Sequence, residues 1–117
     1  MYQYIVDSSA VAEQALELEG VSIKILHQAE DGAIAVVTQM RAGATIPAHW
    51  HSKADETVYV LSGDFIEDGV AYGPGHYFIG AARTVHGPHS SKSGCTLLTH
   101  FSAELDFNLG PAPAAAG

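Results

Sequence analysis

Two histidines one residue apart and a glutamate five positions later stand out in the segment GATIPAHWHSKADETVYVLSG, residues 43–63. Alternate residues of a strand face the same side, so His49 and His51 would point together while Trp50 points away. A turn after His51 would return Glu56, at the start of the next strand, alongside both imidazoles. Buried imidazoles and carboxylates are costly without partners, and a divalent metal ion offsets that cost. Imidazole nitrogen and carboxylate oxygen suit Zn, Fe, Mn, Ni or Co, so the segment predicts a metal site.

The spacing within this segment resembles, without a gap, the first signature motif of the cupin superfamily. The glycines, histidines and glutamate of that motif correspond here to Gly43, His49, His51, Glu56 and Gly63. The resemblance covers about residues 21–102. It implies an all-β fold, a double-stranded β-helix of the jelly-roll type, with a metal ion inside the cupin barrel.

A second cupin motif begins at Gly75, and His86 falls on its metal-ligand position. Ala81 and Arg83 stand where that motif has a proline and a glycine, so the turn before His86 departs from the family pattern. His89 is an alternative last ligand, but the cupin spacing favours His86 and leaves His89 at the rim. The resemblance thus implies one divalent metal ion with four protein ligands: His49, His51, Glu56 and His86.

A narrower resemblance rests on the run HSKADETVYVLSGDFIEDGVAYGPGHYF, followed by HGPHSSKSGC. It is similar to the cupin group that contains acetylacetone-cleaving dioxygenases, dihydroxyacetophenone dioxygenases and the cupin domain of ChrR-like anti-sigma factors. The shared features are a short acidic hairpin, the entry Tyr72-Gly73-Pro74-Gly75 to the next strand, and the stretch from Ser90 to Cys95 after the last ligand. This resemblance implies a non-haem metal site and leaves the reaction open.

The rest of the chain predicts short strands separated by turns, as in an all-β sandwich or small barrel. Asp68-Gly69 is the expected tight turn of a hairpin over residues 64–73. Only the segment 8–19 could be helical, with Ser8 or Ser9 as its cap. We expect a single domain over residues 1–117, with a flexible tail at 110–117. The strands are expected at 21–26, 33–40, 56–62, 76–80, 83–90 and 95–102.

Composition excludes several classes of partner. The 117 residues carry a net charge of −8, and the five cations are scattered, so neither nucleic acid nor an anionic membrane surface is expected to bind. The single cysteine, Cys95, forms no internal disulfide and is expected to be a small core residue. Neither a signal peptide nor an apolar run long enough to span a membrane is visible, so a cytoplasmic protein is expected.

Several residues outside the ligand set are candidates for further roles. Arg83 could hold an acidic or enolate-like substrate, or could be a solvent-facing turn residue. Met40 and Phe78 are candidate walls of a substrate pocket, although apolar strand residues most often belong to the core. His100 could orient a metal ligand or transfer a proton, or could be a strand histidine with satisfied hydrogen bonds.

A metal with four protein ligands keeps one or two open positions, as a catalytic metal requires. The leading hypothesis is a non-haem Fe(II) dioxygenase that cleaves a carbon–carbon bond in a small diketone or hydroxyketone, with Glu56 as a candidate proton acceptor. The alternatives are a metal-dependent lyase or isomerase, a non-catalytic metal sensor and a structural metal store. The segment before residue 21 is too short for the helical domain of ChrR-like sensors, which favours a stand-alone enzyme. A homodimer is expected from the family and from the exposed edges of a β-domain.

Overall fold

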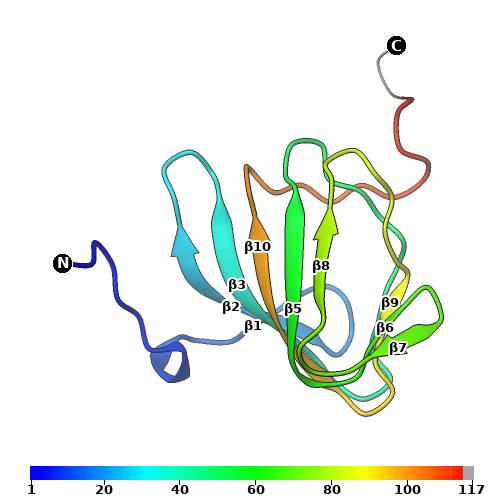
Figure 1. Cartoon of the computed structure of the whole chain (residues 1–117), viewed down its shortest axis with the longest axis horizontal. Helices are drawn as coiled ribbons and strands as arrows, with labels where there is room; N and C mark the ends of the chain where they lie inside the picture. Colours follow the sequence, from blue (N-terminus) through cyan, green and yellow to red (C-terminus); the bar gives the residue numbers. More distant parts are fainter. Residues whose placement is uncertain (115–117) are drawn as a thin grey trace.

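The computed structural model describes residues 1–114, and nearly all of its regular structure is antiparallel strand (Figure 1). One sheet has the order β1-β2-β3-β10-β5-β8, and a second, smaller sheet has the order β4-β9-β6-β7. The prediction of an all-β jelly roll is confirmed. The strands are β1 (Gln14–Ala15), β2 (Val21–Gln28), β3 (Ile34–Met40), β4 (Thr45–Ile46), β5 (Glu56–Gly63), β6 (Phe65–Glu67), β7 (Val70–Tyr72), β8 (Tyr77–Gly80), β9 (His89–Ser90) and β10 (Cys95–Phe101).

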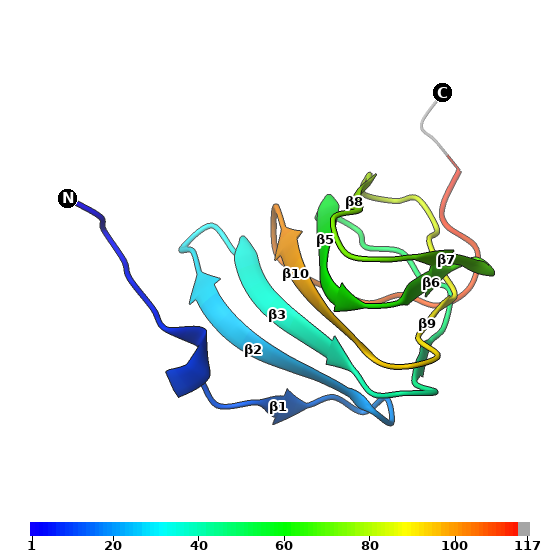
Figure 2. The ribbon, with the colours of Figure 1, turned by 60° about the horizontal axis from the view of Figure 1, so that its bottom comes forward.

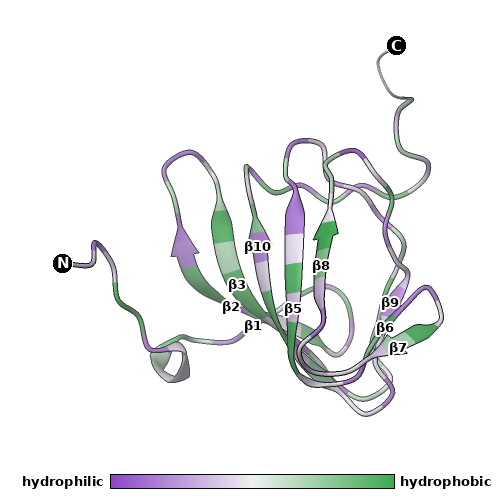
Figure 3. Ribbon diagram, in the orientation of Figure 1, coloured by the Kyte–Doolittle hydropathy of each residue, from purple (hydrophilic) through white to green (hydrophobic). Residues whose placement is uncertain are grey.

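The larger sheet is curved, and the smaller sheet lies toward its β8 side, away from β2 (Figure 2). Strand β10 occupies the middle of the larger sheet, where it pairs with β3 on one side and β5 on the other. Residues of β3 and β10 alternate between buried and more exposed positions, as expected for strands with one face toward a core. Most of β3 is hydrophobic, as Figure 3 shows.

Two groups of buried apolar side chains form the core, and both lie within residues 21–101. Cys95 belongs to the larger group, as predicted for a small core residue. The larger group contains Val21, Met40, Ala44, Val58, Val60, Phe65, Cys95 and Leu97; the smaller contains Ile34, Val36, Ala54 and Phe101.

The N-terminal segment corrects the helix expected over residues 8–19. Only a short 3-10 turn, η1 (Ser8–Ala10), forms there, and its cap is Asp7, whose carboxylate accepts the Ser9 N–H at 3.0 Å. The chain then pairs with the edge of β2 through β1. Pairing with an open sheet edge satisfies these backbone groups and brings the leucines of this segment against the barrel, so tertiary contacts override local helix propensity.

The predicted hairpin after β5 is confirmed. β6 and β7 pair around Asp68 and Gly69, whose φ angles are +46° and +84°. Two consecutive positive φ values are the requirement of the type I′ turn, which matches the twist of a two-stranded ribbon. No helix in the described residues is long and apolar enough to cross a membrane. The tail expected at 110–117 extends beyond the described residues, which end at 114.

Gly63→Ala is expected to destabilise the fold by about 3 kcal/mol or more, because Gly63 combines a positive φ with close backbone packing. Its φ is +80°, and an added Cβ would lie 1.9 Å from the carbonyl oxygen of Gly94. Gly69→Ala is the matched control: its φ is +84°, but nothing lies within 4 Å of the added Cβ. The control should lose only about 1 kcal/mol. Urea unfolding of the three proteins checks this, and equal losses in the two variants would contradict it.

Candidate metal centre

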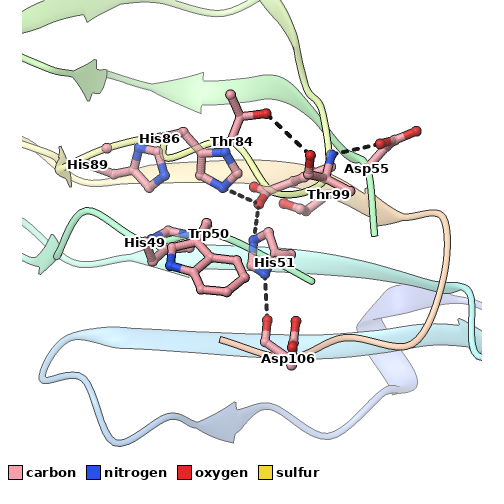
Figure 4. Close-up of polar contacts among 12 residues, drawn as sticks. His49, Trp50, His51, Asp55, Thr84, His86, His89, Thr99 and Asp106 are labelled. Atoms are coloured by element: carbon pink, nitrogen blue, oxygen red, sulfur yellow. Dashed lines mark hydrogen bonds and ion pairs between the residues drawn. The ribbon is translucent and has the colours of Figure 1, made fainter. Parts of the chain in front are cut away.

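The four side chains implied as metal ligands meet inside the barrel. Figure 4 shows three of them, His49, His51 and His86, close together. One ligand atom from each of His49, His51, Glu56 and His86 lies within 4.8 Å of the others. The first three residues are buried and His86 is half-buried. We call these four residues the His/Glu cluster. It is a group that could bind one metal ion.

Backbone pairing places the two neighbouring histidines differently from the expected hairpin. The segment His49–His51 forms no regular strand, and Glu56 does not pair with it, because β5 pairs with β10 and β8. Instead, His49 and His86 exchange backbone hydrogen bonds of 3.0 and 2.9 Å. Trp50 exchanges a second pair, of 3.0 and 3.1 Å, with Asn108. The alternating direction of neighbouring side chains then turns both histidines inward, as predicted.

Backbone carbonyls orient both of these imidazoles. His49 Nδ1 lies 2.7 Å from the Pro47 carbonyl oxygen, and His51 Nδ1 lies 2.5 Å from that of Asp106. A carbonyl only accepts, so each Nδ1 must carry the hydrogen, and each Nε2 is the atom left for a ligand. Hydrogen bonds of this kind, from Nδ1 to a backbone carbonyl oxygen, fix the tautomer and the ring plane of metal-binding histidines.

The Glu56 carboxylate lies between two imidazoles. Its Oε1 atom is 2.9 Å from His51 Nε2 and 3.2 Å from His86 Nε2. Burial works to raise the pKa of Glu56, but the His51 and His86 imidazoles outweigh it and lower that pKa to about 2. Burial lowers the pKa of His49 to about 4, so its imidazole is neutral at pH 7. Burial also opposes protonation of His51, but its hydrogen bonds to Glu56 and Asp106 outweigh burial and raise its pKa.

These contacts fit a cation better than they fit the residues alone. His86 Nε2 is buried and, among the residues that the structure describes, has no hydrogen-bond partner of acceptable geometry. The Nε2 atoms of His49 and His51 are lone-pair donors when neutral. A divalent ion would pair with the anionic carboxylate and accept the imidazole lone pairs. His49, His51, Glu56 and His86 would therefore hold the ion, and its identity is not determined by this set of ligands.

The turn that presents His86 is held by hydrogen bonds, although it lacks the proline and glycine of the motif. Asp55 accepts the Ala82 N–H at 2.8 Å, and the Thr84 hydroxyl donates to the Ala81 carbonyl oxygen at 2.6 Å. Arg83 adopts φ +67°, the left-handed region in which the family motif has glycine, and its N–H donates to the His51 carbonyl oxygen at 2.7 Å. Side-chain hydrogen bonds thus replace the two turn residues that the sequence lacks.

A cavity of about 570 Å³ extends from the cluster along the buried face of the larger sheet. His49, His51 and Glu56 lie in its wall, together with buried apolar residues of the sheet such as Val36 and Leu97. A smaller cavity of about 160 Å³ has Glu56 and His86 in its wall. Glu56 lines both cavities, so the cluster borders each of them.

Two segments outside the predicted core complete the site. We name residues 103–109 the C-terminal strap. The strap supplies the Asp106 carbonyl to His51, pairs with Trp50 through Asn108, and stacks Phe107 on His49 with ring centroids 4.3 Å apart. Leu105, Phe107 and Leu109 of the strap and Leu16 and Leu18 of the N-terminal segment line the larger cavity. Sequence reasoning missed these residues because neither segment carries a motif; only alternating apolar residues mark them.

Two predicted site residues lie away from the cluster. Arg83 is exposed and lines neither cavity, which fits the alternative of a solvent-facing turn residue, while its role in holding a substrate stays a prediction. His100 is exposed on β10, whereas its neighbour Thr99 is buried and lines the larger cavity. Since successive strand residues face opposite sides, His100 lies on the outside of the sheet and cannot transfer a proton at the cluster.

The remaining candidates are placed in the interior with different roles. Met40 is 3% exposed and packs in the larger core group without lining either cavity, so its role as a pocket wall is not supported. Phe78 does lie in the wall of the smaller cavity. His89, which was expected at the rim, is only 6% exposed and lines both cavities.

The family model of the ChrR Cupin-like domain matches residues 2–103. The chain belongs to this family. No curated protein sequence matches it. Family membership fits the jelly roll and the buried His/Glu cluster described above.

Three solved structures share the fold of this ChrR-type cupin. The polyketide cyclase RemF from Streptomyces resistomycificus is 15% identical, with a TM-score of 0.75 over 96% of this chain and 90% of that one. An acetylacetone dioxygenase from Acinetobacter johnsonii is 13% identical, with a TM-score of 0.69 over 86% and 74%. A chain of the Rhodobacter sphaeroides complex of SigE with the anti-sigma ChrR is 25% identical, with a TM-score of 0.66 over 78% and 49%.

Removing one imidazole from the cluster should remove most of the bound metal. His49→Ala and His86→Ala are each expected to weaken metal binding by at least about 100-fold, because removing a metal ligand lowers the metal affinity more than removing a group that only orients a ligand. His100→Ala, on the outer face of β10, is the control and should keep the metal of the original protein. Elemental analysis of protein purified without chelators or a nickel column measures this. Full occupancy in His86→Ala would rule out His86 as a ligand.

Metal binding is expected to weaken as the pH falls. The pKa of His51 is raised above 6.5, so below that pH an incoming ion must displace at least one proton, and below about pH 4 His49 holds another. Glu56, with a pKa of about 2, stays ionised throughout. The dissociation constant for zinc, measured by competition with a chelating dye, should rise severalfold and by up to about tenfold from pH 6 to 5, since one displaced proton contributes at most tenfold per pH unit. A constant value over this range would contradict the assignment.

Proposed function

We propose that the protein is a metal-dependent enzyme acting on a small molecule with a chelating head and a largely apolar body. Within this class, we propose a non-haem iron dioxygenase that cleaves a carbon–carbon bond in a diketone or hydroxyketone. The observation that carries the proposal is the buried His/Glu cluster in the wall of an apolar cavity of about 570 Å³. A cavity of this size falls within the about 300–1,000 Å³ typical of ligand pockets.

Each part of the site has a separate task. A divalent ion held by the four ligands would act as a Lewis acid for two neighbouring substrate oxygens. Hydrogen bonds to the carbonyl oxygens of Pro47 and Asp106 hold the His49 and His51 rings in place. The site therefore needs little rearrangement when the ion and the substrate bind. Phe107, stacked on His49, and the apolar walls exclude water from the reacting part of the substrate.

The shared fold bears on the type of reaction. An acetylacetone dioxygenase shares the fold, which supports oxygen-dependent cleavage of a β-diketone. The apolar cavity, of about 570 Å³, is larger than a small diketone requires, and a polyketide cyclase also shares the fold. A metal-dependent lyase, isomerase or cyclase that needs only the Lewis acid is therefore the second candidate. A metal sensor is the third, supported by the family's ChrR description.

We also propose that the protein forms a homodimer. The N-terminal segment extends away from the barrel (Figure 2) and exposes 81% of Tyr2 and 83% of Ile5. Apolar side chains this exposed are suited to a contact with a second copy.

Oxygen uptake tests the proposed reaction. Protein loaded anaerobically with Fe(II) is mixed with oxygenated β-diketones that carry progressively longer alkyl or aryl tails. One O₂ per substrate should be consumed, with higher kcat/KM for longer tails, and His86→Ala should lose at least about 100-fold in rate. His100→Ala is the matched control and should keep the rate.

Other outcomes assign the other candidates. Substrate conversion by zinc-loaded protein without oxygen uptake would replace the dioxygenase with the lyase, isomerase or cyclase class. Tight metal binding with no conversion by either metal form would favour the sensor and overturn the enzyme.

A further inference from the structure

A second histidine–carboxylate pair lies beside the His/Glu cluster without belonging to it. His89 in β9 lies directly opposite Glu67 in β6 in the pairing of the smaller sheet. The His89 Nδ1 atom is in close polar contact with Glu67 Oε2. The other oxygen of Glu67 accepts the Gly87 N–H at 2.9 Å, which fixes the carboxylate. The sheet register therefore holds this imidazole from one side.

The Nε2 nitrogen of His89 has no partner among residues 1–114. His89 is 6% exposed, and within that part of the chain its Nε2 atom is buried without a hydrogen-bond partner. The ring lies against Phe65, with centroids 5.0 Å apart, and 5.4 Å from the ring of His49. A buried polar atom without a partner costs free energy, and such atoms in folded proteins call for an explanation.

The position of His89 supplies that explanation. It lines both the larger and the smaller cavity, as Glu56 does, so a ligand that reaches the cluster lies against its ring. Figure 4 shows His89 next to His86 on the same side of the cluster. The cluster itself consists of four other side chains, and His89 is not among those whose ligand atoms lie within 4.8 Å of one another. Its Nε2 is therefore available to the ligand.

We propose that His89 Nε2 takes a proton from the carbon acid or enol of a substrate held at the His/Glu cluster, with Glu67 positioning the imidazole. The step rests on the proposed function. The C–H bond between two carbonyl groups breaks, its electron pair becomes the enolate, and its proton bonds to Nε2. The Glu67 carboxylate, which faces Nδ1–H, balances the resulting imidazolium charge. No oxidant is needed for this step.

The same pair explains why Glu56 is not needed as the proton acceptor. Glu56 Oε1 is already shared by His51 and His86 at 2.9 and 3.2 Å. Glu67 is different, because within residues 1–114 it forms no ion pair or hydrogen bond with a member of the cluster, and its carboxylate contacts His89 and Gly87 instead. Burial works to raise the pKa of Glu67, but the contact with His89 outweighs burial and lowers it, so the carboxylate is ionised.

Proton transfer can be measured apart from oxygen chemistry. Zinc-loaded protein is incubated without oxygen in D₂O with benzoylacetone, and exchange of the hydrogens between its carbonyls is followed by NMR above the background of buffer and free zinc. His89→Gln should lower the exchange rate at least about tenfold, and Glu67→Gln should lower it to a smaller degree. Zinc content and benzoylacetone affinity should stay within about twofold, since neither residue is a ligand. His76→Gln, an exposed histidine, is the control.

A second readout does not depend on turnover. Two-bond ¹H–¹⁵N spectra of the zinc-loaded protein should show His89 protonated on Nδ1 and neither protonated nor zinc-bound on Nε2, and Glu67→Gln should lose this single tautomer. Two results would overturn the role of His89 and leave the proposed function standing. One is zinc bound to His89 Nε2. The other is an unchanged exchange rate in both variants while the original protein binds the probe and exchanges its hydrogens. Failure of the original protein to bind any β-diketone would overturn both.

Discussion

The carboxylate of Glu56 shares one oxygen between two imidazole nitrogens in the interior of the barrel, and this contact governs the rest of the site. A bare imidazole nitrogen and a carboxylate oxygen both carry lone pairs, so they approach within 3.2 Å only when a proton or a metal ion lies between them. The protein directs the Nδ1 hydrogens of His49 and His51 to backbone carbonyls. The remaining nitrogens face inward, as a metal ligand must.

Polar and apolar groups of the same segments surround this cluster. The strap and the segment before His49 supply the backbone carbonyl groups that hold the rings. Apolar side chains of these segments also line the larger cavity, which offers a ligand few hydrogen bonds. Such an environment strengthens the electrostatic effect of a bound ion on the atoms next to it. Selection among ligands then falls to the shape of the cavity and to the few polar atoms in its wall, of which His89 is one.

Departures from the family pattern are compensated locally. Arg83 takes a left-handed backbone conformation that costs a residue with a Cβ about 1 kcal/mol relative to glycine. Asp55 and Thr84 hold the same turn through side-chain hydrogen bonds, and the Arg83 N–H fixes the carbonyl of His51. The position of His86 also depends on Gly80, since a Cβ there would lie 2.9 Å from His86 Nδ1. The turn therefore presents its histidine without the proline and glycine of the motif.

Local patterns in the sequence determined the all-β class, most of the strand positions, the Asp68–Gly69 hairpin and the grouping of His49, His51 and Glu56. These features depend on period-two alternation, on turn chemistry and on fixed spacing, all of which act over a few neighbouring residues. The jelly roll and the ligand role of His86 followed from the resemblance to the two cupin motifs, and the strand expected over 83–90 forms only at His89–Ser90. Tertiary structure decided which nitrogen of each histidine faces inward, that His100 and Arg83 lie outside, and that His89 is buried opposite Glu67. It also replaced the expected helix over 8–19 with an edge strand and brought the strap across the site. Each of these outcomes depends on contacts between residues far apart along the chain, and a single sequence carries no local signal for such contacts.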